Sequence, residues 1–202
     1  MTRVRFFGIA TSSLLVAILV GCGGSPDSRF YTLGGGAIPA GDRNEKATAE
    51  YIIAVGPVSL PESVDRPQIV VRVGPNQVAI MEQHRWAAPL GSEISRVIAE
   101  DLAQLLGNRM VSSYEQNNTR PDIQVLVDLQ RFDSTLGESV TIDALWSVRR
   151  SLNGQTKTGR SLIQEPAGGE GYDALVAAHS RALAKVSGDI AEAIRNAGPP
   201  AR

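Results

Sequence analysis

Residues 123–148 read IQVLVDLQRFDSTLGESVTIDALWSV, and this stretch decides the fold class of the chain. Two runs within it alternate apolar and polar residues, which predicts two half-buried strands. The residues that point to one side are Ile123, Val125, Val127 and Leu129 in the first run, and Val140, Ile142, Ala144, Trp146 and Val148 in the second. Because the opposite side of each run is largely polar, we expect a partly solvated sheet, as is typical of antiparallel sheets.

Further strands are predicted on both sides of this stretch. Asn153-Gly154 is a strong hairpin signal and joins the second run to a strand over 156–164. Upstream, the sequence predicts a short strand over 29–33, a buried strand over 51–58 that Gly56-Pro57 interrupts, and a hairpin of 68–73 with 77–82 across Gly74-Pro75-Asn76.

Two long amphipathic helices are also predicted. The first runs from about Pro89 to Leu106, since proline suits a helix start and Gly107 can cap the end. The second runs from Tyr172 to Asn196, and both carry apolar residues at spacings of three and four. The order of elements indicates a single α/β domain, with a mixed, mostly antiparallel sheet packed by two long helices.

The N-terminus has the features of a bacterial lipoprotein signal. Two arginines precede an uncharged, mainly apolar segment over 6–20, whose 15 residues span roughly 22 Å as a helix, short of a ~30 Å hydrocarbon core. The sequence Leu19-Val20-Gly21-Cys22 that follows resembles the lipobox, and Cys22 is the only cysteine of the chain. We therefore expect a signal peptide over 1–21, a lipid-attached Cys22 with a flexible tether to residue 28, and one domain over 29–202.

The charge balance excludes some classes of partner. The chain has 20 Lys and Arg against 21 Asp and Glu, without a basic stripe. A nucleic-acid-binding domain would show such a stripe, so no nucleic-acid partner is expected.

No set of residues suggests catalysis. The chain has two histidines and one cysteine, which makes a zinc site of these ligands improbable, and no motif for a nucleophile elbow, P-loop or dinucleotide fold is present. His179 lies on the apolar stripe of the second helix and is interpreted as a core histidine with one hydrogen bond. Asp128 and Asp143 lie opposite the apolar runs of their strands and are interpreted as solvated. We expect neither an enzyme nor a cofactor.

Four segments resemble one known family. They are VGPVSLPESVDRPQIVVR (55–72), HRWAAPL (84–90), RFYTL (29–33) and VLVDLQRFD (125–133). Together they are similar, in order, to the auxiliary lipoproteins of ABC-type transport systems, the family that includes PqiC and YmbA. The sequence departs from the family pattern at Ser63, where relatives often carry an aromatic residue, and at Ala88, where they often carry an acid.

The resemblance implies a non-enzymatic role. Such proteins are the lipoprotein component of an envelope-spanning lipid transport system that includes an MCE (mammalian cell entry) protein and contributes to membrane integrity. The residues that would bind this partner are Leu60, Asp65, Arg66, Arg85 and Trp86. Pro61 and Pro67 stiffen the loop between them, which lowers the entropy lost on docking. The alternative interpretation is that Trp86 packs over the helix start and that Asp65 caps the loop.

A second function remains open, in which the protein itself carries a small hydrophobic ligand between helices and sheet. A cavity of ligand size would favour the carrier, and a filled core with an exposed apolar rim would favour the interaction protein. Gly23 is not the aspartate associated with retention in the inner membrane, so we expect the lipid anchor to lie in the periplasmic face of the outer membrane. The sequence leaves homo-oligomerisation open.

Overall fold

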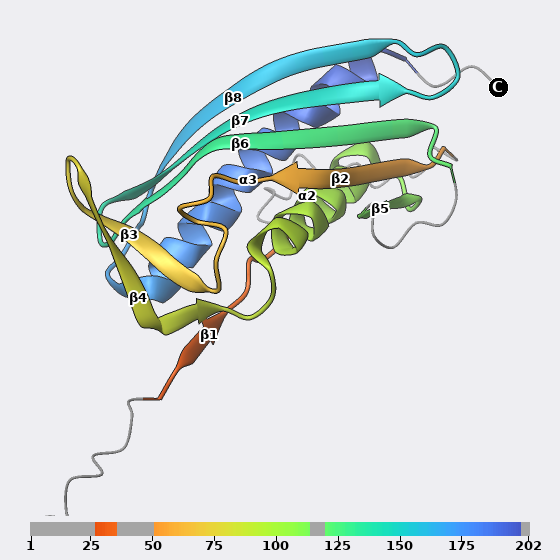
Figure 1. Ribbon diagram of the computed structural model, residues 1–202. Helices are drawn as coiled ribbons and strands as arrows, with labels where there is room; N and C mark the ends of the chain where they lie inside the picture. Colours follow the sequence, from red (N-terminus) through yellow and green to blue (C-terminus); the bar gives the residue numbers. More distant parts are fainter. Residues whose placement is uncertain (1–26, 36–50, 114–119, 199–202) are drawn as a thin grey trace, which may run out of the picture.

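The computed structural model describes residues 27–35, 51–113 and 120–198, which form eight strands and two helices (Figure 1). Their order along the chain is β1 (Arg29–Tyr31), β2 (Ile53–Ser59), β3 (Gln68–Gly74), β4 (Gln77–Trp86), α2 (Leu90–Leu106), β5 (Val111–Ser113), β6 (Ile123–Thr135), β7 (Ser139–Arg150), β8 (Thr156–Pro166) and α3 (Gly171–Asn196). The predicted α/β class and both long helices are confirmed.

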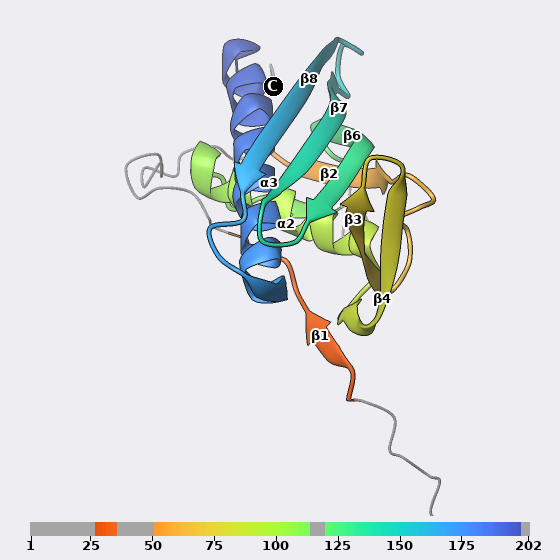
Figure 2. The same ribbon diagram turned by 90° about the vertical axis from the view of Figure 1, so that its left-hand side faces the viewer.

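The larger sheet has the strand order β5-β2-β6-β7-β8. The two runs of residues 123–148 are its central antiparallel pair, β6 and β7, and their apolar residues are buried. β2 pairs in parallel with both β5 and β6. Both helices cover the same face of this sheet, α2 over β2 and β5 and α3 over β7 and β8 (Figures 1 and 2).

The β3–β4 hairpin belongs to a second sheet with the order β1-β4-β3, so the prediction of one sheet is wrong. β2 shifts register between Val55 and Val58, where Pro57 has no N–H for the ladder. The chain then turns away through the loop between Pro61 and Pro67 before the hairpin forms. β3 of the smaller sheet contacts β6 of the larger sheet, and Arg72 of β3 donates to Asp133 of β6 at 3.2 Å.

Two smaller features differ from expectation. β5 is three residues long and follows no apolar period, so it was not predicted. The β7–β8 hairpin is confirmed, but its loop runs from Arg150 to Thr156 rather than through Asn153-Gly154 alone. Gly154 still occupies the left-handed region, with φ of +67°, where glycine is favoured.

The expectation that Asp143 is solvated is wrong, whereas Asp128 is exposed as expected. Asp143 does face away from the helices, but it is only 4% exposed. Arg160 on β8 donates from Nε to Oδ1 at 2.8 Å and from its Nη2 to Oδ2 at 2.6 Å. This pairing keeps the pKa of the Asp143 carboxyl below its usual value. The carboxylate therefore links two strands instead of meeting water.

The helix ends match the sequence. Pro89 is the N-cap of α2, and Gly107 ends the helix in the left-handed conformation with φ of 59°. The two helices pack on each other through their apolar stripes, and Ser187 of α3 donates to the buried carboxylate of Asp101 at 3.1 Å. Within the described residues, no helix is long and apolar enough to cross a membrane.

His179 is a core histidine with one hydrogen bond, as predicted. Its ring stacks on Phe132 with centroids 4.0 Å apart, and Nε2 shares a hydrogen bond with the hydroxyl of Ser134 at 2.7 Å. The side chain is fully buried, and burial lowers the pKa of His179 to about 3 because the charged imidazole cannot be solvated there.

This lowered pKa predicts a stability loss in mild acid. The unfolded chain binds a proton at His179 near pH 6.5 while the folded chain does not, so the free energy of unfolding falls as the pH drops below about 6.5. The slope is at most about 1.4 kcal/mol per pH unit. Urea unfolding between pH 6.5 and 5 should show it, and His179→Gln should flatten it; an unchanged slope in the variant would show that another group causes the loss.

Candidate partner-binding surface

The loop between β2 and β3 is held at both ends by backbone hydrogen bonds. The carbonyl of Pro61 accepts from the N–H groups of Val64 at 3.0 Å and Asp65 at 3.1 Å. At the other end, the carbonyl of Pro67 accepts from the N–H of Trp86 at 2.7 Å. Val64 is partly buried against the core. The loop is therefore a fixed turn rather than a free segment, which is favourable for docking.

Leu60 enters this loop beside the start of α2. A methyl group built on Gly91 would lie 3.8 Å from the Leu60 side chain and 3.5 Å from the carbonyl of Val58. The hydroxyl of Ser95 donates to the carbonyl of Val55 at 2.7 Å and holds α2 on the same strand. Leu60 is thus half-buried, and it fixes the base of the loop while offering only part of its surface.

The charged residues of this surface have no charged partner within the described part of the chain. Asp65 is exposed, and neither a hydrogen bond nor an ion pair engages its side chain, so it does not cap the loop. Arg66 and Arg85 are half-buried, and the Nε of each is buried without an acceptor. Buried donors are normally paired, so two unpaired ones near one loop point to an acceptor outside these residues.

Arg85 and Trp86 belong to β4 and lie on its opposite faces. Arg85 stands opposite Gln68 on β3, close to the end of the loop. Trp86 is only 5% exposed, and its indole contacts Phe132 edge-on with ring centroids 6.3 Å apart and His179 at 6.4 Å. The expectation that Trp86 touches a partner is therefore corrected: its side chain packs in the core, and the accessible candidates are Leu60, Asp65, Arg66 and Arg85.

The first strand is clamped onto both helices in a way that the sequence did not suggest. The N–H of Leu33 donates to the Glu93 carboxylate at 3.2 Å, and Arg96 donates to the carbonyl of Leu33 at 2.7 Å. One residue later, the N–H of Gly34 donates to the hydroxyl of Ser180 on α3 at 3.0 Å. A glycine run reads as a loop in the sequence, so only the fold reveals this docking.

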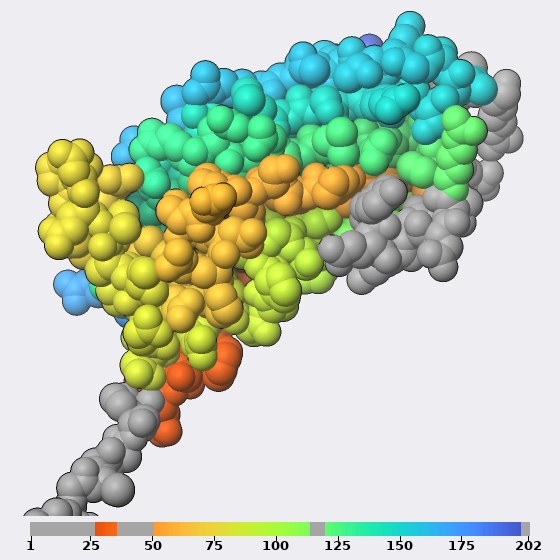
Figure 3. All heavy atoms as spheres, in the orientation of Figure 1, coloured from red at the N-terminus to blue at the C-terminus, as the bar shows by residue number. Residues whose placement is uncertain are grey.

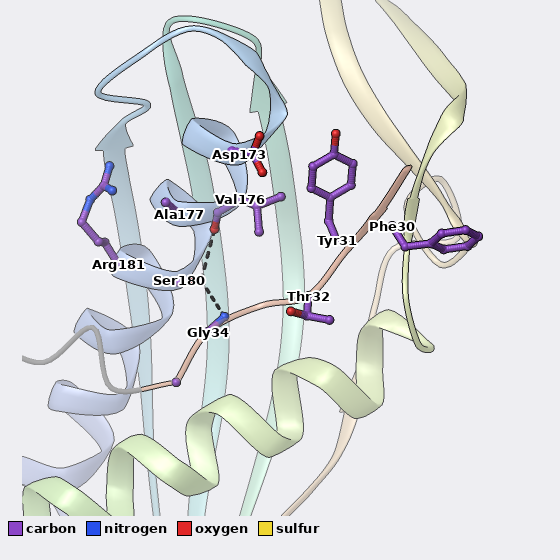
Figure 4. A pocket seen from close by; sticks show the side chains of 10 residues that line it. Phe30, Tyr31, Thr32, Gly34, Asp173, Val176, Ala177, Ser180 and Arg181 are labelled. Carbon is purple, nitrogen blue, oxygen red and sulfur yellow. Dashed lines mark hydrogen bonds between the residues drawn. The ribbon is translucent and has the colours of Figure 1, made fainter. Parts of the chain in front are cut away.

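An open cleft of about 600 Å³ lies between β1 and α3 (Figure 4). Phe30 and Tyr31 line it from the strand, and Asp173 and Arg181 line it from the helix. A second cleft of about 650 Å³ lies between the β3–β4 turn and the β6–β7 turn, with Val73 and Leu136 in its walls. Both clefts are on the surface, whereas the layer between helices and larger sheet is filled by one continuous cluster of buried side chains.

The described residues contain no group of three or more His, Cys, Asp or Glu that could hold a metal ion. Cys22, the predicted site of lipid attachment, lies outside the described residues.

The family model described as "ABC-type transport auxiliary lipoprotein component" matches residues 31–191. The chain belongs to this family. The matched part begins in β1 and ends in α3, so it contains the loop and Arg85. The family predicted from the four sequence segments is thus confirmed, and with it a role as a transport auxiliary lipoprotein.

Solved structures show the same fold. A crystal structure of an uncharacterized protein has a TM-score of 0.67 at 20% identity and covers 83% of this chain and 99% of its own. Protein XCC0632 from Xanthomonas campestris, of the family DUF330, has a TM-score of 0.68 at 18% identity and covers 85% of this chain and 97% of its own. No protein of curated function matches the sequence significantly.

Burial predicts a large loss of stability for a substitution at one residue of the family motifs and almost none at another. Trp86→Ala should lower the free energy of unfolding by about 3–5 kcal/mol, because it leaves a large cavity in the core. Asp65→Lys should change it by less than about 0.5 kcal/mol, because the carboxylate is exposed and unpaired. Urea unfolding at pH 7 measures both, and a Trp86→Ala protein as stable as wild type would mean that the indole is not packed as described.

Proposed function

We propose that this transport auxiliary lipoprotein is the non-enzymatic component of an envelope-spanning ABC/MCE-type lipid transport system that contributes to membrane integrity. In this proposal residues 1–21 are a signal peptide, and lipid on Cys22 anchors the domain to the periplasmic face of the outer membrane through a short tether. Its partner is the MCE-domain protein of the same system, which docks on the loop carrying Leu60, Asp65 and Arg66 and on the neighbouring Arg85.

The observation that carries this proposal is the set of unpaired charges on the fixed loop and on the neighbouring strand β4. Asp65 has no partner, and the buried Nε atoms of Arg66 and Arg85 have no acceptor among the described residues. An arginine with a half-buried stem loses little freedom when it pairs, which suits it to an interface. A partner that offers a carboxylate or carbonyl to the arginines and a cation to Asp65 would satisfy all three.

The filled core supports the interaction role over the carrier role. A carrier would need a cavity between helices and sheet for its hydrophobic ligand. That layer is occupied by side chains such as Leu102, Ile142 and Leu183, all fully buried. The clefts near β1 and the β3–β4 turn open on the surface, so they expose a ligand instead of enclosing it.

Lipid attachment can be tested at the sulfur of Cys22, the proposed attachment atom. Cys22→Ser removes the only thiol of the chain, so the variant should accumulate as an uncleaved precursor without incorporated fatty acid. Radiolabelled palmitate and membrane fractionation measure both effects. A variant that is processed and membrane-bound like wild type would rule out Cys22 as the anchor, and wild-type protein in inner-membrane fractions would contradict the outer-membrane location alone.

Docking is tested by reversing the exposed charge of the loop. Asp65→Lys should weaken co-purification of the MCE partner by roughly thirtyfold, the loss expected for an anchor worth ~2 kcal/mol. Glu192→Lys makes the same charge change at an exposed position of α3 and should have no effect. If a folded Asp65→Lys protein binds the partner with wild-type affinity, the docking surface lies elsewhere. The outer face of β7 and β8 would then be the next candidate.

A further inference from the structure

The smaller sheet has an outer face that points away from the core. Strand register assigns its residues: Phe30 lies beside Arg85, Arg72 beside Val78, and Ile80 beside Val70, which is itself buried but lies outside the core cluster. The neighbouring residues in the chain, such as Tyr31 and Val71, point inward and are buried. The outer face is therefore a separate surface from the core.

This outer face is unusually apolar for an exposed one. Phe30 is 64% exposed, Val78 is 50% exposed and Ile80 is 43% exposed. One exposed apolar residue needs no explanation, but several on one small sheet mark a contact surface. The face also carries two basic side chains at its margins, Arg72 and Arg85. Arg72 pairs with Asp133, whereas Arg85 has no ion pair to a described residue. Glu82 of β4 accepts a hydrogen bond from Gln68 of β3 at 3.1 Å.

The position of this face relative to the anchor indicates what covers it. Phe30 is on the first strand of the domain, and only the six residues 23–28 separate that strand from Cys22. Six extended residues reach at most about 20 Å, so the strand cannot move farther than this from an anchored bilayer. In Figures 1 and 3, β1 and the β3–β4 hairpin form one end of the molecule, and the β7–β8 turn lies at the other.

We propose that the outer face of the smaller sheet rests on the phospholipid surface. Phe30, Val78 and Ile80 enter the headgroup region, while the neighbouring partner-binding loop stays free to dock its protein partner. The proposal rests on the anchorage at Cys22 described above. The short tether holds the face at a high effective concentration near the lipid, so a contact too weak to recruit an unanchored protein is populated here. Aromatic residues favour this interfacial level.

The experiment places a tryptophan at each end of the full lipidated protein. Phe30→Trp reports on the proposed contact, and Leu152→Trp is the matched control, because Leu152 is 72% exposed in the β7–β8 turn. Each variant is reconstituted in vesicles of phosphatidylethanolamine and phosphatidylglycerol, with and without acyl-chain-brominated lipid. The signal of the native Trp86 and Trp146, both buried, is subtracted using wild-type protein. Flotation of the vesicles first confirms that the protein is anchored.

The expected result is that the added emission of the Phe30→Trp variant shifts to the blue, is quenched by brominated lipid and is protected from aqueous iodide, whereas the control stays open to iodide. Equal behaviour of the two variants, with or without lipid quenching, would overturn the proposal. So would protection of the Phe30→Trp variant that appears only when the protein partner is added, since the face would then bind protein. Failure to float would overturn the anchorage at Cys22, and this proposal with it, before any fluorescence is measured.

Discussion

The burial of Trp86 holds the smaller sheet on the rest of the domain. A sheet of three strands, one of them only three residues long, is marginal in isolation and needs an apolar layer to pack against. Trp86 supplies this contact, because its indole reaches the stacked pair of Phe132 on β6 and His179 on α3. Its backbone N–H also fixes Pro67 at the end of the loop. The loop, the hairpin and the first strand are therefore all tied to Trp86, in addition to the clamp of Leu33 and Gly34 on the helices.

Local patterns were sufficient to predict most elements, but not how strands pair across the chain. Periodicity and capping residues located both helices and the central strands, because these signals act within a few residues of each other. The separation into two sheets depends on long-range pairing, such as β1 with β4 across more than fifty residues. Asp143 shows the same limit for a side chain: its position opposite the apolar run was readable, but its burial depends on Arg160 of the neighbouring strand.

The sequence likewise predicted part of the candidate site but could not decide the role of Trp86. The family motifs located Asp65 and Arg66 on a proline-bounded loop, and the structure keeps both accessible. Trp86 followed an arginine in an equally specific motif, yet tryptophan is enriched both in cores and at interfaces. Only the positions of Phe132 and His179, which are 46 and 93 residues away in the sequence, decide between the two. A conspicuous residue in a motif can thus serve the fold that presents the proposed binding residues, and not the binding itself.

The buried or half-buried acids serve as structural links: Glu93 holds Leu33 and Arg96, Glu165 holds Arg181 and Lys185, and Asp143 holds Arg160. Arg181 and Lys185 likewise keep the pKa of Glu165 below its usual value, so it stays ionised and unable to donate a proton near neutral pH. Conversely, burial keeps His179 neutral, with its reactive ring enclosed against Phe132. Asp65 and the buried Nε atoms of Arg66 and Arg85, in contrast, have no partner among the described residues and lie where another molecule can reach them.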